Sequence, residues 1–213
     1  MSVSAKICGI STAVALDAAI GGGATHVGFV FFPKSPRNVS IEQAAGLAAR
    51  VPGHVNKVGL FVEPNLDFLA QVLAVIPLEV IQLHGNESPS LLARLRSAYG
   101  LELWKAVPVR TRADLEVGKA YHGLADRLLY DAKPPNGAEL PGGNGLRFDW
   151  KLLEGHRHMA PWALSGGLDP ANAAEAARVT GAQLLDVSSG VESTPGVKDV
   201  DKIAAFLQAV ASL

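Results

Sequence analysis

Short apolar segments alternate with amphipathic segments along the chain, and this alternation is what most restricts its possible folds. Eight segments of four to six residues are largely apolar on both faces, which is typical of parallel strands buried on both sides. The expected strands are Ala5–Ile10, His26–Phe31, Lys57–Val62, Val80–His84, Leu103–Val107, Arg127–Asp131, Trp162–Ser165 and Leu184–Ser188. The expected helices lie between and after them, at Ser11–Ile20, Ile41–Arg50, Asn65–Ile76, Ser88–Ala98, Thr111–Tyr121, Phe148–Leu153, Pro170–Val179 and Val200–Val210.

Residues that favour helix boundaries support this division. Ser40 precedes one helical segment, and Gly100 and Gly181 stand where two others are expected to stop. Eight strand-then-helix units predict an α/β protein of the (β/α)8 TIM barrel type, with one domain over residues 1–213. A doubly wound open sheet is the alternative, but it usually has fewer strands and its last strand need not return to the first.

Charge and cysteine content exclude several classes of partner. The chain has 19 Lys+Arg against 20 Asp+Glu and no basic run, so neither nucleic acid nor an anionic membrane is an expected partner. A single cysteine excludes an internal disulfide and any multi-thiolate metal site. No apolar run reaches a membrane-spanning length and the N-terminus does not resemble a signal peptide, so we expect a cytoplasmic protein.

In a barrel of this type the active site lies at the carboxyl ends of the strands, so the polar residues there are the candidates. Glycine pairs follow the seventh and eighth strands, where barrels commonly bind a phosphate through backbone N–H groups. The sequence therefore predicts a phosphate site at this edge. The polar strand ends are Cys8-Gly9, Ser35-Pro36-Arg37, His84-Gly85-Asn86-Glu87, Asp131, Ser165-Gly166-Gly167 and Ser188-Ser189-Gly190-Val191-Glu192.

Two of these residues have the chemistry of an acid–base pair. Cys8 is either a small buried residue or a base, and Lys6, two positions earlier on the same strand face, would favour its thiolate. Asp131 is either structural or a general acid beside apolar walls. Asp186 lies in the middle of the eighth strand, next to the first in a closed barrel, so we expect a buried Lys6–Asp186 ion pair with a structural role.

Three further features have a functional and a structural interpretation. His84 is a possible general base, although a histidine bonded to loop backbone is the commoner case. His156 and His158 look like metal ligands, but they lack an acidic or thiol neighbour, so we expect them to be solvated and expect no metal. The irregular stretch at 132–147 is either a functional loop or a tolerated insertion.

An ordered set of motifs at consistent spacing makes the chain resemble the phosphoribosylanthranilate isomerases of tryptophan biosynthesis over essentially its whole length. No single motif decides this resemblance, but the ordered set is specific. The motifs are Lys6-Ile7-Cys8-Gly9-Ile10, Val27-Gly28-Phe29-Val30-Phe31 with Ser35-Pro36-Arg37, Gln82-Leu83-His84-Gly85, Ser165-Gly166-Gly167-Leu168, Asp186-Val187-Ser188-Ser189-Gly190-Val191-Glu192 and Pro195-Gly196-Val197-Lys198-Asp199.

The resemblance implies an Amadori rearrangement of N-(5-phosphoribosyl)anthranilate, a small phosphorylated substrate, with no metal or organic cofactor. It implies that Cys8 is the general base, that Asp131 is the general acid, and that Arg37 binds the anthranilate carboxylate. The family includes monomers and dimers, so either a monomer or a homodimer is expected. The resemblance also implies further substrate-binding positions, with backbone of the glycine-rich strand ends on the phosphate, namely His84, Gly166, Gly167, Ser189 and Gly190.

Two positions depart from the family pattern. The loop after the sixth strand has Gly142-Gly143-Asn144-Gly145 where the third residue is usually threonine, and Asn144 can still offer a side-chain hydrogen bond. Tyr130 replaces a smaller aliphatic residue, and by strand alternation it should face the helices.

Other functions remain to be weighed. A related barrel that synthesises indole-glycerol phosphate would need an inward-facing lysine, for which Lys105 is the only tempting candidate. A histidine-pathway isomerase normally uses an aspartate pair, which Cys8 argues against. A phosphate-binding barrel without catalysis would be expected to lack Cys8 or Asp131, and this chain has both.

Overall fold

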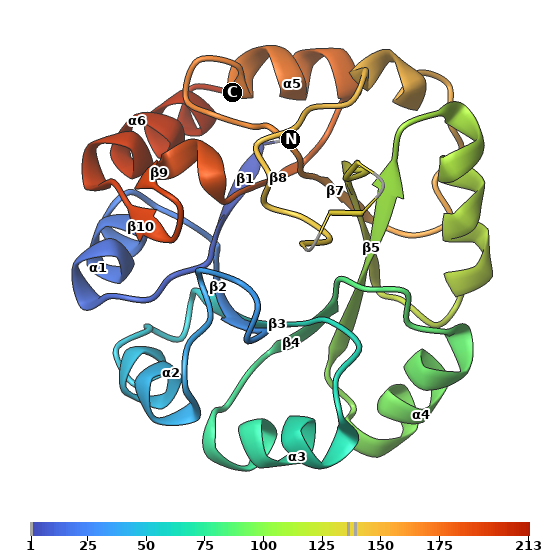
Figure 1. Ribbon diagram of the computed structural model, residues 1–213. Coiled ribbons are helices and arrows are strands. Elements are labelled where there is room, and N and C mark those ends of the chain that lie inside the picture. The colour runs from blue at the N-terminus through green and yellow to red at the C-terminus, as the bar shows by residue number, and fades with distance from the viewer. Residues whose placement is uncertain (1, 136, 139) are drawn as a thin grey trace.

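In the computed structural model, which describes residues 2–135, 137–138 and 140–213, eight parallel strands close into a barrel with β1 beside β8 (Figure 1). Lys6 is in register with His26 on one side and with Asp186 on the other, so the closed (β/α)8 prediction is confirmed and the open sheet is wrong. Asn136, within the predicted loop, lies outside the described residues. The strands are β1 Ser4–Cys8, β2 His26–Phe31, β3 Asn56–Phe61, β4 Val80–Leu83, β5 Glu102–Val109, β6 Arg127–Ala132, β7 Trp162–Leu164 and β8 Leu184–Val187.

Helices surround the ring of strands (Figure 1). Most begin where the sequence predicts, with Thr12, Ser40, Asn65 and Ser88 each accepting a backbone hydrogen bond as the N-cap. The segment predicted at Pro170–Val179 becomes helical only from Ala173. The α-helices are α1 Ala13–Gly21, α2 Ile41–Ala48, α3 Leu66–Val75, α4 Pro89–Tyr99, α5 Ala173–Thr180 and α6 Val200–Ala211.

Two of the predicted α-helices are 3₁₀ segments instead, η1 Arg112–Tyr121 and η2 Trp150–Leu153. In η1, a β-carbon on Gly118 would lie 2.8 Å from Leu128 Cδ1, so the segment packs closely on β6 through a residue that is a poor helix former. A 3₁₀ helix also rises about 2.0 Å per residue instead of about 1.5 Å, so it covers more of the barrel with the same chain. η2 is too short to hold an α-helical nucleus.

The chain after β8 forms structure that the sequence did not predict. A short 3₁₀ turn, η3 Ser189–Val191, leads into an antiparallel hairpin of β9 Glu192–Thr194 and β10 Val197–Lys198. This hairpin places the charged side chains of its two strands at the mouth of the barrel, where they matter for the site below.

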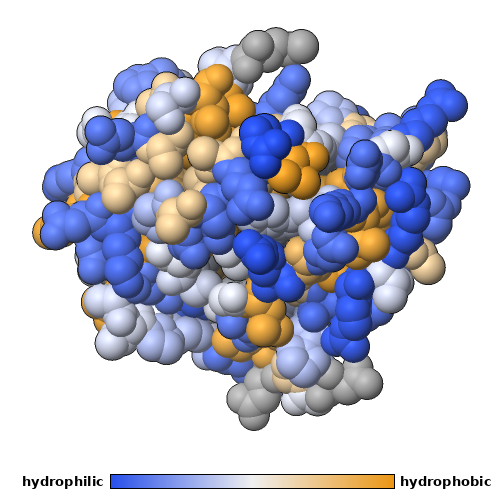
Figure 2. Space-filling view, turned by 90° about the horizontal axis from the view of Figure 1, so that it is seen from above, coloured by the Kyte–Doolittle hydropathy of each residue, from blue (hydrophilic) through white to orange (hydrophobic). Residues whose placement is uncertain are grey.

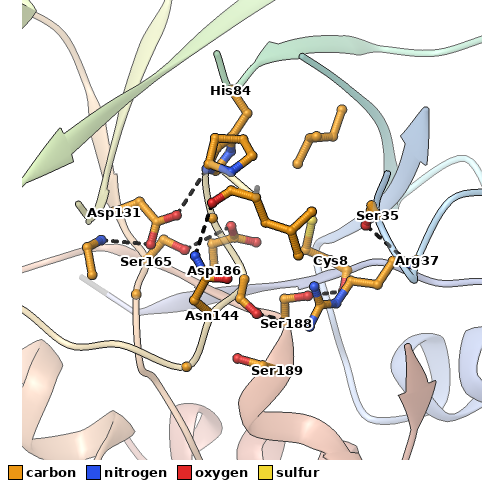
Figure 3. Close-up of a pocket in the computed structure, with 18 of the residues that line it drawn as sticks. Cys8, Ser35, Arg37, His84, Asp131, Asn144, Ser165, Asp186, Ser188 and Ser189 are labelled. Atoms are coloured by element: carbon orange, nitrogen blue, oxygen red, sulfur yellow. Dashed lines mark hydrogen bonds and ion pairs between the residues drawn. The ribbon is translucent and has the colours of Figure 1, made fainter. Parts of the chain in front are cut away.

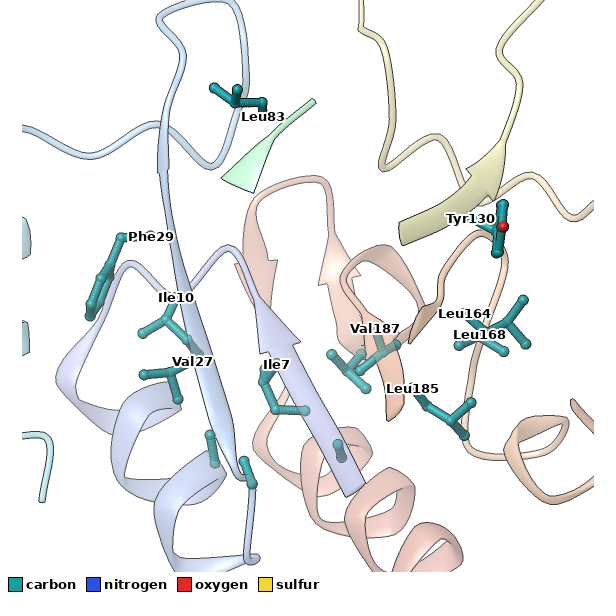
Figure 4. Packing of buried hydrophobic residues seen from close by; sticks show 14 of the residues in the cluster. Ile7, Ile10, Val27, Phe29, Leu83, Tyr130, Leu164, Leu168, Leu185 and Val187 are labelled. Carbon is teal, nitrogen blue, oxygen red and sulfur yellow. The ribbon is translucent and has the colours of Figure 1, made fainter. Parts of the chain in front are cut away.

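The core has two layers, as the alternation of strand residues requires. One layer lies between the strands and the helices and includes Ile7, Phe29 and Leu83 (Figure 4). Tyr130 is fully buried in this outer layer, which confirms that it faces the helices (Figure 4). The inner layer fills the barrel with Val58, Val80, Trp104, Ala106, Leu129, Ala163 and Leu184.

The amino-terminal end of the barrel is closed by polar and aromatic groups around Trp104. The His26 ring lies 5.1 Å from the Trp104 ring, and the Arg127 guanidinium lies 5.1 Å from it. His26 is also hydrogen-bonded to the side chains of Thr25 and Asn56. Burial, together with the charges of Lys6 and Arg127, lowers the pKa of His26 to about 4.

On the face shown in Figure 2, hydrophilic side chains are interspersed with smaller apolar areas. Among the described residues, no helix has the length and apolar character needed to cross a membrane.

Candidate active site

A pocket opens at the carboxyl ends of the strands, and most of the predicted site residues line it (Figure 3). In this view Cys8 at the end of β1 and Asp131 near the end of β6 lie on opposite sides, with His84 above and Arg37 beside Cys8. The predicted residues that line the pocket are Cys8, Arg37, His84, Asp131, Gly166, Gly167 and Ser189. Gly190 is not among them.

Cys8 lies next to a buried ion pair. Lys6 Nζ is 2.7 Å from Asp186 Oδ1, and both side chains are almost inaccessible to solvent, which confirms the predicted pair. Asp186 Oδ2 also accepts a hydrogen bond of 3.3 Å from Ser165 Oγ. A β-carbon at Gly28 would lie 3.0 Å from Cys8 Sγ, so the glycine on the neighbouring strand leaves room for the thiol.

The electrostatics of Cys8 differ in part from the expectation. Burial raises the pKa of Cys8, and the Asp186 carboxylate acts in the same direction, whereas the Lys6 and Lys198 ammonium groups act to lower it. Lys6 therefore favours the thiolate as predicted, but burial outweighs it. The pKa of Lys6 is itself raised, because Asp186 and Cys8 together outweigh the opposing effect of burial.

Asp131 is held by two hydrogen bonds. Its Oδ1 accepts a bond of 2.8 Å from the Ala132 backbone N–H, and its Oδ2 is 3.0 Å from His84 Nε2. The other ring nitrogen of His84, Nδ1, is 3.0 Å from the side-chain amide of Gln82. The expectation that His84 bonds to loop backbone is wrong, because its two ring nitrogens contact side chains on β4 and β6.

Arg37 is fixed by an acid that the sequence reasoning did not assign. Its Nε and Nη2 atoms donate to the two carboxylate oxygens of Glu192 at 2.7 and 2.8 Å. Lys198 Nζ lies 2.8 Å from the same carboxylate. Although burial opposes it, these two cations lower the pKa of Glu192. Glu192 and Lys198 lie on either side of the turn at Pro195-Gly196. Opposite charges in this position are a hairpin signal that could have revealed the Glu192–Lys198 contact from the sequence.

The glycine pair after β7 provides unpaired backbone donors. Gly166 and Gly167 have φ values of +86° and +64°, which favour glycine. Neither of their N–H groups donates a hydrogen bond to another described residue. Ser189 also lines the pocket (Figure 3). Gly190 packs behind it, where an added β-carbon would lie 1.8 Å from the Leu168 carbonyl oxygen.

One wall of the pocket is apolar. Cys8 packs with Val30 and Leu60, and Phe32 and Val62 extend the same cluster. This wall is suited to the flat face of an apolar or aromatic group.

The loop after β6 covers the site. A β-carbon on Gly142 would lie 2.5 Å from His84 Nε2 and 2.6 Å from Asp131 Oδ2, so this glycine passes directly over the pair. The Gly143 carbonyl accepts a bond of 3.1 Å from Arg37 Nη2. Asn144 uses its side-chain amide within the loop, donating to the Leu140 carbonyl at 3.2 Å.

Lys105 does not face the pocket. Its Nζ lies 3.2 Å from Glu87 Oε2 and donates to the carbonyl groups of Gly85 and Ala106. Burial lowers the pKa of Lys105, and its charge is used to fix the loop after β4. The inward lysine required by the indole-glycerol-phosphate alternative is therefore not supplied by this residue.

The two histidines that look like metal ligands belong to an aromatic cluster. The His158 ring stacks on Trp162 with centroids 4.4 Å apart, and His156 packs edge-on against Tyr130. Burial and the neighbouring His156 lower the pKa of His158 to about 4. The expectation that both side chains are solvated holds only in part, because aromatic neighbours partly bury them. Within the described residues, no group of three His, Cys, Asp or Glu side chains could hold a metal ion.

A family model and a curated relative that match this chain carry the same family description. Residues 5–209 match the family model described as N-(5'-phosphoribosyl)anthranilate (PRA) isomerase. A curated relative from Paramagnetospirillum magneticum, named N-(5'-phosphoribosyl)anthranilate isomerase, is 54% identical over 98% of this chain and 97% of its own length.

Two solved structures with the same fold carry further information. One, at 34% identity and a TM-score of 0.86, covers 99% of this chain and 100% of its own, and is a phosphoribosyl anthranilate isomerase in complex with reduced 1-(o-carboxyphenylamino)-1-deoxyribulose 5-phosphate. The other, at 35% identity and a TM-score of 0.85 with the same coverage, consists of monomers generated from the dimeric enzyme of Thermotoga maritima.

Proposed function

Because the chain belongs to the N-(5'-phosphoribosyl)anthranilate isomerase family, we propose that its pocket binds N-(5-phosphoribosyl)anthranilate and isomerises it by acid–base catalysis with Cys8 and Asp131. The chain is an isomerase of tryptophan biosynthesis, and the product of the proposed reaction is 1-(o-carboxyphenylamino)-1-deoxyribulose 5-phosphate. A solved relative binds the reduced form of that compound, which supports this choice of substrate.

The pocket has one surface suited to each part of the substrate. The free N–H groups of Gly166 and Gly167 would take the phosphate, together with the backbone around Ser189. The apolar wall beside Cys8 would take the anthranilate ring. Arg37, held by Glu192, borders that wall and would bind the ring carboxylate through the edge of its guanidinium that faces the loop. The ribose would then lie between Cys8 and Asp131.

The reaction needs one acid and one base. Asp131 would protonate the furanose ring oxygen, and the C1′–O bond would break as the anthranilate nitrogen donates its electron pair to form a Schiff base. The Cys8 thiolate would then remove the proton from C2′, and the resulting enolamine would tautomerise to the ketone. The substrate nitrogen is the electron sink, so the proposal includes no cofactor. The observation that carries it is that a thiol and a carboxyl group from β1 and β6 face one pocket between an arginine and unpaired glycine N–H groups.

The test is the decay of anthranilate fluorescence when phosphoribosylanthranilate is generated in the presence of the protein. We expect turnover in the natural sequence and its collapse in Cys8→Ala and in Asp131→Asn, with unfolding midpoints retained. Asp17→Asn is the matched control, because that carboxylate is 55% exposed and pairs with an exposed arginine. Unchanged turnover in Cys8→Ala would keep the reaction but assign the base to another residue.

We also infer the setting in which this catalysis occurs. The chain would act as a single catalytic domain in the cytoplasm, with a small phosphorylated molecule as its only partner and no nucleic acid or membrane. Its state would be either monomer or homodimer, and a relative described as dimeric supports the second. Sedimentation equilibrium measures which of the two it adopts.

A further inference from the structure

Gln82 is a buried polar side chain that the proposed chemistry leaves unexplained. It lies on β4, in register with Leu60 and Trp104, and its side chain has no solvent exposure. Its amide nitrogen Nε2 is 3.0 Å from His84 Nδ1, but its Oε1 is buried with no hydrogen-bond partner among the described residues. A buried oxygen without a hydrogen-bond partner is destabilising, so its presence calls for a physical reason.

The reason lies in how a neutral imidazole shares its single proton. Because the side-chain N–H of Gln82 donates to His84 Nδ1, Nδ1 must be the unprotonated acceptor. The single ring proton of His84 must then be on Nε2. In this arrangement His84 Nε2–H points at Asp131 Oδ2, 3.0 Å away. The Ala132 N–H donates to the other oxygen. The carboxyl group of Asp131 is thereby fixed in orientation from both sides.

The alternative tautomer would oppose the proposed acid. With the proton on Nδ1, the lone pair of Nε2 would face Asp131 Oδ2, and after Asp131 had given its proton to the substrate two acceptors would face each other. With the proton on Nε2, His84 donates to Asp131 both before and after that transfer. No proton then has to move between the two ring nitrogens during turnover.

We propose that Gln82 is a positioning residue, which fixes the tautomer of His84 by donating to Nδ1 and through it holds Asp131 in the orientation needed for proton donation. This inference rests on the proposed function, in which Asp131 is the acid. The surroundings of the pair are consistent with a fixed contact, because Gly142 covers it at a distance that leaves no room for a β-carbon.

The first test observes the tautomer directly and needs no variant. ¹⁵N spectra of protein labelled at histidine, with the His84 signals assigned by their loss in His84→Asn, should show a protonated Nε2 and an unprotonated Nδ1. A protonated Nδ1 in the natural sequence would overturn the proposal.

The second test changes the donor. Gln82→Met has similar volume and no donor, so His84 should lose its tautomer preference and kcat should fall about 10- to 100-fold, with KM changed by less than about twofold. Gln82→Glu, studied at a pH where the new carboxyl group is ionised, offers only acceptors and should move the proton to Nδ1. Gln43→Met is the matched control, because the same exchange occurs on an exposed helical face.

The outcomes separate this proposal from the proposed function. If Gln82→Met leaves both the His84 spectrum and kcat unchanged, Gln82 has no positioning role. If instead the tautomer behaves as expected but Asp131→Asn retains full activity, the assignment of Asp131 as the acid is wrong while the control of His84 by Gln82 stands. If Gln82→Met does not fold, the proposal is tested by the ¹⁵N spectrum of His84 in the natural sequence and in Gln82→Glu.

Discussion

Replacing Lys6 with methionine should leave the Asp186 carboxylate buried without its cation. The pair is 2.7 Å long, the two side chains are 0% and 3% exposed, and Ser165 Oγ at 3.3 Å is the other side-chain donor to this carboxylate among the described residues. Removing one member of such a buried pair costs about 3–5 kcal/mol. The whole free energy of unfolding of a domain is about 5–15 kcal/mol, so the loss is a large fraction of it.

The assay is thermal denaturation of the natural sequence and of Lys6→Met, followed by circular dichroism. For a chain of this length a loss of 1 kcal/mol lowers the melting temperature by about 2–4 °C, so we expect a decrease of about 6–20 °C. The double variant Lys6→Met with Asp186→Leu removes the stranded charge and replaces both groups with apolar ones, so it should recover most of the loss.

A second ion pair provides the control. Lys57 Nζ is 2.9 Å from Glu79 Oε1, but 43% of the Glu79 side chain is exposed, so Lys57→Met leaves a carboxylate that water can reach. Its expected cost is about 0–1 kcal/mol. The reasoning is refuted if Lys6→Met is no more destabilising than Lys57→Met, or if the double variant is as unstable as Lys6→Met alone.

Three further predictions follow from the same structure. Because burial raises the pKa of Cys8, its alkylation by iodoacetamide should reach half its maximal rate above the ordinary thiol pKa, and a midpoint below that value would contradict the electrostatics described. The folded pKa of His26 is about 4 against an ordinary 6.5, so the unfolded chain takes up the proton first on acidification. Stability present above pH 6.5 should therefore fall as the pH approaches 4, by an amount on the order of 3 kcal/mol, and His26→Gln should flatten this slope in urea titrations. Gly190→Ala puts a β-carbon 1.8 Å from the Leu168 carbonyl oxygen and should cost stability or raise KM strongly, whereas Gly46→Ala, with nothing within 4 Å, should cost neither.

The strand pattern predicted the barrel because alternation and burial are local properties of the sequence. The pairing of Lys6 with Asp186 was also predictable, because closure of the barrel makes β1 and β8 neighbours and both residues lie at inward positions. The 3₁₀ form of η1 was not, because the choice between helix types there depends on how closely Gly118 packs on Leu128.

The partners of the site residues were harder to predict than the residues themselves. His84 was expected on loop backbone. Its contact with Gln82 is local, because the two residues are two positions apart, but its contact with Asp131 depends on the tertiary arrangement that brings the ends of β4 and β6 together. The Arg37–Glu192 pair joins residues 155 positions apart, so it depends on tertiary geometry even though the turn of the hairpin that carries Glu192 has a sequence signal. The local sequence pattern thus identified most of the residues that line the pocket, whereas the long-range hydrogen bonds that orient their side chains depend on tertiary geometry.

Closure of the barrel between β1 and β8 has a consequence for how the enzyme is made. Lys6 and Asp186 are 180 positions apart in the sequence. Ribosomes add about 5–20 residues per second, so Asp186 is synthesised roughly 10–35 seconds after Lys6. During that interval one edge of the first strand has no neighbour, and Cys8 lacks the Asp186 carboxylate that acts on its pKa in the folded chain. Pairing of β8 with β1 is the last step in forming the barrel. Enzyme activity should therefore first appear during synthesis when this pairing closes the ring.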